Sequence, residues 1–424
     1  MRLTQLFTAL SSRNYRLFFA GQIISLIGTW MTQTASLWLV YNLSHSAFNL
    51  GVIGFASTVP IFFLAPFAGV LVDRVNRHRL LVITQVMAML QSFALAAFAL
   101  TGTITVTHLV VLSLVQGLIN AVDMPVRQAV VVEFVERREH LGNAIALNSS
   151  MFNLARLIGP ALAGFVIAGV GPGYCYVVDG VSYLAVIIAL LAMRLAKRPA
   201  RPVQHHPWVD MKRGFQYAYN FAPIRALILL VAAISAIGFS YSVLTPIYAK
   251  DVFHGTARTL GYLMSASGIG ALTAAIYLGT RTTIHGLGNV IAFGGAVMGC
   301  GLIGFALSHW LALSLVCLMF AGLGGVLLMA SSNTLVQTLV DDDKRGRVMS
   351  IFSMGFTGTM PVGNLLVGFL AHKIGTLITL IACGALCILI AGIFFRAIPN
   401  LRAQAAPALA KLDPTIFEPT VPEG

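Results

Sequence analysis

Asp123 and Arg127 lie four positions apart within a long apolar stretch of the chain. A charge inside a bilayer costs about 2.5–3.5 kcal/mol on insertion scales, so it normally faces a partner, a ligand or an aqueous cavity. A spacing of four places two side chains on one face of a helix, where an acid and a base can pair. The spacing therefore predicts an ion pair, which can latch two parts of the protein together, carry a proton or serve only as a structural link.

Arg156 is a second charge in an apolar stretch and has no acid within one helical turn. It lies about 15 residues, or roughly 22 Å along a helix, from the start of that stretch, which is near mid-depth in a membrane. Asp179, near the outer end of the next stretch, could approach it. We expect Arg156 to contact a substrate or a coupling site, or else to bridge to Asp179. Asn148 and Asn153 share one side with Arg156 and either line a cavity or bond between helices.

Four further side chains combine stacking or hydrogen-bonding groups with positions in apolar stretches: Trp30, Gln33, Tyr241 and Asn333. Together they could form the wall of a binding cavity. Taken singly, aromatic residues in membrane helices more often pack or anchor the helix at the interface.

The elements that carry these residues must be membrane-spanning helices. The chain has 424 residues, of which 58% are hydrophobic and 10% charged, whereas soluble domains carry about 25% charged residues. Each crossing needs about 20 apolar residues, and helices satisfy their own backbone hydrogen bonds in lipid. The apolar runs predict twelve spans, at residues 15–42, 48–72, 80–101, 106–132, 141–169, 174–193, 223–249, 259–280, 287–307, 310–335, 347–371 and 375–396.

The placement of the basic residues predicts the orientation of these spans. The net charge is +13, and most Lys and Arg fall in the N-terminus, every second loop and the C-terminal region. Arg127, Arg156 and Arg225 lie within or beside helices, which leaves Lys250, Arg258 and Lys373 for the other side. Basic loops stay in the cytoplasm, so both termini are expected there. This asymmetry accounts for the basicity and argues against binding to nucleic acid.

A long stretch rich in Lys, Arg, His and Pro divides the chain into two sets of six spans, which predicts an all-α membrane protein with a 6+6 arrangement. Ser149 and Pro160 in the fifth span align with Ser350 and Pro361 in the eleventh at one constant offset. Parallel repeats of six helices are found in transporters. The expected regions are an interfacial N-terminal helix (1–14), a first bundle (15–195), a cytoplasmic linker (196–222), a second bundle (223–398) and a disordered cytoplasmic tail (399–424).

The loop after the second span reads GVLVDRVNRHRLL, from Gly69 to Leu81. It resembles the signature loop of the major facilitator superfamily, with Gly69, Asp73, Arg74 and Arg77 at matching positions. Asn76 stands where a glycine is usual in that family, and Asn tolerates left-handed turns better than most residues. The resemblance implies that Asp73 lies at a helix N-terminus, which favours a carboxylate, and that the loop latches the cytoplasmic side closed.

Three more segments resemble an efflux branch of this superfamily that includes enterobactin-exporter-like and macrolide-efflux-like proteins. They are the runs Asp123–Ala129, Asn143–Ser150 and Asp179–Ala185. The run ARLIGPALAG, with Gly159 and Pro160, is similar to the Gly-Pro motif of the superfamily's exporters. Small residues allow close helix approach, and proline loosens the helix backbone. The arginine usual in the fourth span of the family is replaced by Ser113, which weakens the usual proton-relay assignment.

The resemblance implies a monomeric secondary transporter in the inner membrane. We expect it to export small amphipathic drugs, siderophores or metabolites by alternating access, coupled to protons and in contact with membrane lipid. A lysophospholipid or lipid flippase is the main alternative. An intramembrane enzyme using Asp341, Asp342 and Asp343 is a remote one, since no second acidic cluster accompanies them.

The sequence predicts neither a cofactor nor a metal site. An ATP-driven pump would need a phosphate-binding loop that ends in Gly-Lys, and the chain contains no Gly-Lys pair. The five cysteines lie mostly within apolar spans and have no metal-ligand spacing, so we interpret them as small buried hydrophobic residues.

Overall fold

The computed structural model describes residues 8–135, 137–193, 207–281, 283–341 and 344–410, and within these ranges it contains helices and no β-strand. Twelve segments of the described chain are long and apolar enough to cross a membrane, which confirms the predicted all-α fold. The helices that form them are α1 (Arg13–Ser44), α2 (Ala47–Arg74), α3 (Arg77–Leu100), α4 (Val106–Phe134), α5 (Leu141–Val170), α6 (Gly173–Leu191), α8 (Ala222–Ile237), α10 (Ala257–Thr280), α11 (Leu287–Leu307), α12 (Leu311–Leu339), α13 (Arg345–Thr357), α14 (Met360–Ile374) and α15 (Thr376–Ala410).

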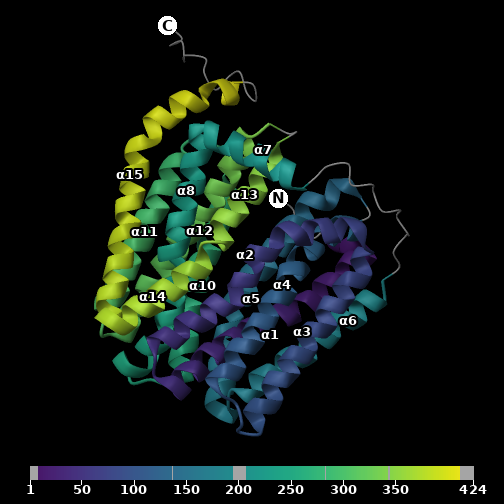
Figure 1. Cartoon of the computed structure of the whole chain (residues 1–424), viewed down its shortest axis with the longest axis vertical. Coiled ribbons are helices and arrows are strands. Elements are labelled where there is room, and N and C mark those ends of the chain that lie inside the picture. The colour runs from purple at the N-terminus through teal and green to yellow at the C-terminus, as the bar shows by residue number, and fades with distance from the viewer. Residues whose placement is uncertain (1–7, 136, 194–206, 282, 342–343, 411–424) are drawn as a thin grey trace.

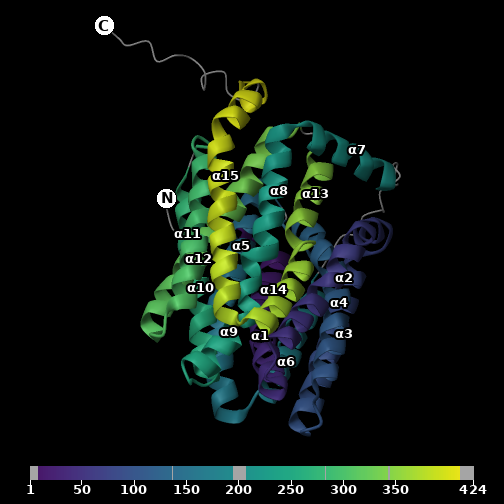
Figure 2. The same ribbon diagram turned by 60° about the vertical axis from the view of Figure 1, so that its left-hand side comes forward.

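The helices form two bundles that lie side by side, α1–α6 in one and α8–α15 in the other (Figure 1). An additional helix, α7 (Pro207–Asn220), lies across one end of the second bundle (Figure 2). We call this end of the molecule the linker side. The predicted linker at 196–222 therefore contains a helix, and its residues 196–206 lie outside the described part of the chain.

Local capping explains where several helices begin. Asn76 caps α3, because its side-chain oxygen accepts a hydrogen bond of 3.0 Å from the backbone N–H of Arg79. Thr105 and His108 form a reciprocal capping box at the start of α4. Asn and Thr are favoured at these positions because they satisfy backbone N–H groups that have no partner within the helix. The Asn that replaces the usual glycine of the signature loop thus starts the third span.

Two spans that were predicted as single helices are broken. The seventh continues from α8 through a 3-10 turn (Phe239–Leu244), α9 (Thr245–Ile247) and a π-helical segment (Tyr248–Val252). The eleventh is divided into α13 and α14 just before Pro361. Proline lacks the N–H that a continuous helix requires, and Pro246 and Pro361 lie at these breaks.

The two ends of the chain differ from the predicted boundaries. Residues 8–11 form a single 3-10 turn ahead of α1, and 1–7 lie outside the described residues, so the interfacial helix at 1–14 is not found in the described part. Helix α15 continues to Ala410, which corrects the expectation of disorder from 399. Ile398 and Leu401 pack on the core and Ala405 is buried, so apolar packing holds the helix together beyond Pro399.

The bundles meet through small residues on the side opposite the linker. A Cβ added to Gly261 in α10 would lie 2.6 Å from the Pro160 carbonyl oxygen of α5 and 3.3 Å from the Gly164 Cα. A Cβ on Gly51 in α2 would lie 3.0 Å from the Gly368 Cα of α14. Only residues without side chains permit this approach. The halves are therefore sealed together at α5–α10 and α2–α14.

Candidate functional site

Four side chains meet near the middle of the spans where the bundles join. The Arg156 guanidinium of α5 lies over the Trp30 ring of α1, 5.9 Å from its centroid, and donates a hydrogen bond of 3.3 Å to the Ser267 hydroxyl of α10. The Tyr241 hydroxyl donates to the same oxygen at 2.7 Å. We call these four residues the central cluster. It combines a cation, an indole and two hydroxyls at one place between the halves.

Aromatic packing and the broken seventh span position this cluster. Phe152, one turn before Arg156, meets the Trp30 ring edge-on at 5.8 Å between centroids. Tyr241 lies in the 3-10 turn that follows α8 and is buried, so the interruption of that span carries its hydroxyl toward α10. A Cβ added to Gly159 would collide with the Trp30 Cβ, so no larger residue fits at this position.

Among the described hydrogen bonds, none joins the other predicted cavity residues to the central cluster. Gln33 is exposed, one turn from Trp30. Asn153 donates to the Ser149 carbonyl of its own helix at 2.9 Å, and Asn333 accepts from Gln337 within α12 at 3.2 Å. Asn148 is half-buried on α5.

Polar contacts join the halves on the outer side of the central cluster, away from the linker. Tyr41 of α1 donates a short hydrogen bond to Asp251, and Lys250 donates a short one to Asn42. Lys250 also lies 5.9 Å from the centroid of the Tyr41 ring. Both charged residues come from the π-helical segment of the seventh span. These hydrogen bonds add to the close glycine contacts that join the two bundles on the side opposite the linker.

Asp179 is held inside the first bundle and does not bridge to Arg156. Its carboxylate accepts hydrogen bonds from Thr32 of α1 at 2.9 Å and from Ser92 of α3 at 2.8 Å. Helix α6 packs on α1 and α3, whereas the Arg156 face of α5 packs on α10, so the two side chains point into different interfaces. The alternative of a structural bridge is therefore wrong. Asp179 is 2% exposed, and its Oδ1 has no hydrogen-bond partner.

Asp123 and Arg127 form the ion pair that their spacing predicts, toward the linker end of α4. Asp123 is 2% exposed and also accepts hydrogen bonds from Thr84 at 2.8 Å and Gln85 at 2.6 Å, both on α3. Arg77 pairs with Glu133 of α4 at 2.9 Å. The pairs thus tie α3 to α4 in this half. The side chains of Asp73 and Arg74, and the surroundings of Gly69, lie outside the described part of the structure.

We expect Asp123→Asn to destabilise the protein by about 3 kcal/mol, because it leaves the Arg127 guanidinium without its buried counter-charge. The double variant Asp123→Asn/Arg127→Gln should recover much of that loss, since it removes the stranded cation. Thermal unfolding in detergent measures both. Equal melting temperatures for the wild type and Asp123→Asn would contradict this assignment.

The sequence did not single out Ser267, Glu133 or the Tyr41–Asp251 contact. Ser267 lies among small residues in α10, and its role depends on contacts with two distant segments. Glu133 carries a signal that could have been used, because an acid at the end of the fourth span faces the signature loop. Tyr41 and Asp251 are 210 positions apart, and no local pattern links them.

The known proteins that this chain resembles are membrane transporters. The family model described as transmembrane secretion effector matches residues 4–422. The staphyloferrin A transporter of Staphylococcus aureus is 27% identical over 89% of this chain and 94% of its own. The multidrug efflux pump Tap of Mycolicibacterium fortuitum is 27% identical over 88% of this chain and 93% of its own.

A solved structure shares the fold. It is the bacterial homologue of the human lysosomal transporter Spinster, in an inward-facing and unoccupied conformation, with a TM-score of 0.71 and 13% identity over 94% of this chain and 98% of the other. The family and the relatives are transporters and not enzymes. The chain is therefore a multi-pass membrane transporter that belongs to the transmembrane secretion effector family of the major facilitator superfamily.

Proposed function

We propose that this transporter exports small amphipathic compounds by alternating access. The observation that carries the proposal is the central cluster, which lies at mid-depth directly inside a seal between the two halves. A substrate bound there would be closed off on the outer side, as an exporter requires while it loads from the cytoplasm. The relative named as a multidrug efflux pump supports the same direction of transport, and the relative named as a staphyloferrin A transporter supports a small-molecule substrate.

The cluster suits a compound with an aromatic or apolar body and an anionic or hydrogen-bond-accepting group. The Arg156 guanidinium has five N–H donors in a planar fork, and its described hydrogen bonds use one of its nitrogens, for Ser267. The remaining donors can bind a carboxylate or a phenolate in a bidentate way. Trp30 offers a ring face for stacking. Siderophores with catechol groups and aromatic drugs that carry an acidic group combine these features.

The ion pairs of the first bundle are candidates for the inner gate. Asp123, Arg127, Arg77 and Glu133 lie toward the linker side, where the halves must close when the outer side opens. In the proposed cycle, Asp73 and Arg74 take part in the same closure, as the signature loop implies. Pro160 lies on the surface of α5 that faces Gly261 of α10, where small residues and a missing N–H ease sliding, whereas Gly159 faces Trp30 of α1 and allows the close approach of that helix.

Both termini are proposed to be cytoplasmic, because the basic loops lie on the linker side. In a variant without native cysteines, Gln404→Cys should be protected from a membrane-impermeant maleimide in whole cells, and His372→Cys should be labelled. Both residues are exposed, so accessibility reports the side of the membrane. Labelling at 404 with protection at 372 would reverse the proposed orientation.

Asp179 is our candidate for the coupling proton site. A carboxylate buried without a cation is costly in a low-dielectric interior, and binding a proton removes that cost. Its contacts tie α1, α3 and α6 together, so its protonation would alter the packing beside Trp30 and Gly28. A Cβ on Gly28 would lie 2.8 Å from the Asp179 Oδ1, which shows how little room separates the acid from α1.

Inverted membrane vesicles with an acidic interior test this coupling. The wild type should accumulate a fluorescent amphipathic dye, whereas Asp179→Asn should reduce this uphill transport at least about tenfold. Counterflow of the same dye without a proton gradient should persist in the variant, since exchange needs no net proton movement. The proton role would be disproved by normal uphill transport in Asp179→Asn.

A further inference from the structure

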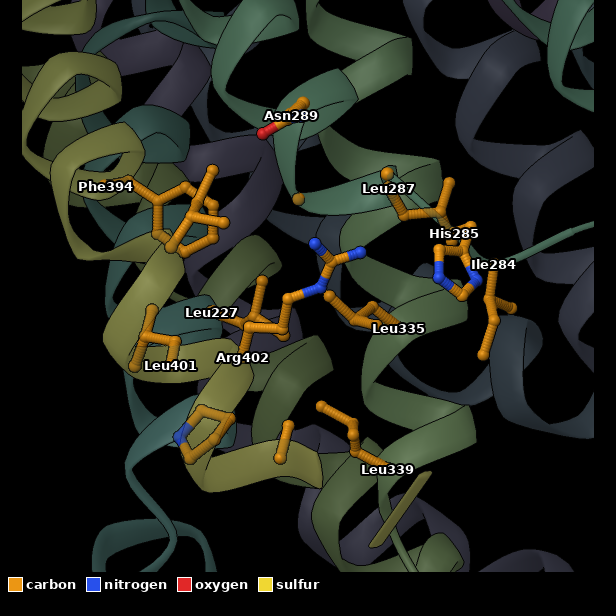
Figure 3. Close-up of a pocket in the computed structure, with 15 residues that line it drawn as sticks. Leu227, Ile284, His285, Leu287, Asn289, Leu335, Leu339, Phe394, Leu401 and Arg402 are labelled. Atoms are coloured by element: carbon orange, nitrogen blue, oxygen red, sulfur yellow. The ribbon is translucent and has the colours of Figure 1, made fainter. Parts of the chain in front are cut away.

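The second bundle contains a cavity of about 400 Å³ near its linker end, away from the central cluster. Its walls come from the start of α8, the segment 284–289, the end of α12 and the end of α15 (Figure 3). The apolar part of the lining includes Leu227, Leu335, Leu339 and Phe394. Cavities of this size and composition are typical of small-molecule sites.

A large aromatic ring is buried at the matching place in the first bundle. Helices α4 and α12 each have 29 residues, and Gly117 and Gly322, at matching positions, both pack directly against a backbone carbonyl of another helix. Phe134, the last residue of α4, is fully buried and packs on Phe18 at 5.3 Å between ring centroids. The residue at its position in α12 is Leu339. The second bundle therefore lacks the large ring that occupies this space in the first.

Two basic side chains border the cavity, and its lining contains no acid. The Arg402 guanidinium extends from α15 toward the space between Asn289 and Leu287, while His285 lies on the opposite wall (Figure 3). Arg281 fixes the His285 backbone by donating a hydrogen bond of 2.5 Å to its carbonyl oxygen. Gly286, which lines the cavity, has a φ of +73° that favours glycine. The backbone at His285 and Gly286 is thus held in a defined shape.

We propose that this cavity binds an anionic amphiphile, with its apolar body between α8, α12 and α15 and its anionic group at Arg402 and His285. Apolar walls that carry a guanidinium and an imidazole and no acid favour a carboxylate or a phosphate attached to a hydrocarbon chain. Such a ligand can be an anionic lipid of the adjacent leaflet or a soluble amphipathic acid. The site is separate from the central cluster and does not depend on the proposed transport cycle.

Binding of radiolabelled laurate to the purified full-length protein in neutral detergent tests the proposal. Arg402→Gln should weaken binding about tenfold, because it removes a charge-assisted hydrogen bond. Leu339→Phe should abolish it by filling the space as Phe134 does in the first bundle. Arg396→Gln is the matched control, since Arg396 is exposed on the same helix and does not line the cavity. Size-exclusion chromatography checks that each variant is folded.

A second arm identifies the source of the ligand. A photoreactive phosphatidylglycerol in nanodiscs should label peptides containing Leu335–Leu339 or Leu401–Arg402 if the ligand is a lipid, and Arg402→Gln should reduce that labelling. Laurate binding without lipid labelling supports the site and assigns it to a soluble acid. The proposal is overturned if neither probe binds there, or if dodecanol binds as tightly as laurate and Arg402→Gln changes nothing.

Discussion

Arg156→Leu is expected to abolish transport while leaving the protein folded. The guanidinium supplies the positive charge of the central cluster, and a substrate that carries an acceptor group would lose its main polar contact. Removing one partner of such a charge-assisted contact costs about 2 kcal/mol or more, which corresponds to a loss of roughly 30-fold or greater in the rate of loaded transport. The structural cost is small, because Arg156 is half-buried and makes one hydrogen bond of 3.3 Å and one ring contact.

Transport of an anionic siderophore and thermal unfolding in detergent measure the two effects separately. Arg156→Lys should retain part of the transport, because lysine keeps the charge and loses the planar fork. Ser267→Ala should have a weaker effect than Arg156→Leu, since it removes only the hydroxyl that orients the guanidinium. Full transport by Arg156→Leu would place the substrate elsewhere. A large loss of stability without a selective transport defect would assign the residue to structure.

Gly261→Leu is expected to stop transport by preventing the outer seal from forming. The added Cβ would lie 2.6 Å from the Pro160 carbonyl oxygen and 3.3 Å from the Gly164 Cα, and three further carbons would follow it into the α5–α10 interface. Overpacking of this kind typically costs about 1–3 kcal/mol. That cost falls on the sealed state and not on a state in which the halves are apart there. The variant would therefore rarely reach the conformation in which α5 and α10 are in contact, and the transport cycle would stop.

Gly279→Leu is the matched control, because Gly279 lies on the same helix and a Cβ there meets nothing within 4 Å. It should transport normally. Pulsed EPR between spin labels at Leu43 and Lys373, which belong to different halves, should report a longer distance in Gly261→Leu than in the control. Unchanged distances together with normal transport in Gly261→Leu would show that the seal tolerates the side chain and is not a gate.

The helices were predictable because their signal is local. Apolar runs of sufficient length predicted all twelve spans, and the spacing of Asp123 and Arg127 predicted their ion pair. The breaks in the seventh and eleventh spans were not predicted, because a proline can either break a helix, as at Pro361, or remain inside it, as at Pro160 in α5. The surrounding packing decides between the two outcomes.

The partners of the buried charges were not predictable, because they depend on which helix faces pack together. Asp179 was expected to be within reach of Arg156, but it lies between α1 and α3 and bonds to Thr32 and Ser92. The Ser267 hydroxyl is 111 positions from Arg156 in the chain, and only the close approach of α5 and α10 brings them together. Sequence spacing contains no information on such contacts between the halves.

Transport by the purified protein in proteoliposomes is the most direct test of proton-coupled export, because no other pump is present. Vesicles containing the protein in known orientation are given a siderophore or an amphipathic dye and a proton gradient of either sign. We expect the compound to move from the linker side to the opposite side, against its own gradient, only when protons can flow the other way. Movement of labelled lipid but of no soluble compound, or transport that ignores the proton gradient, would contradict it.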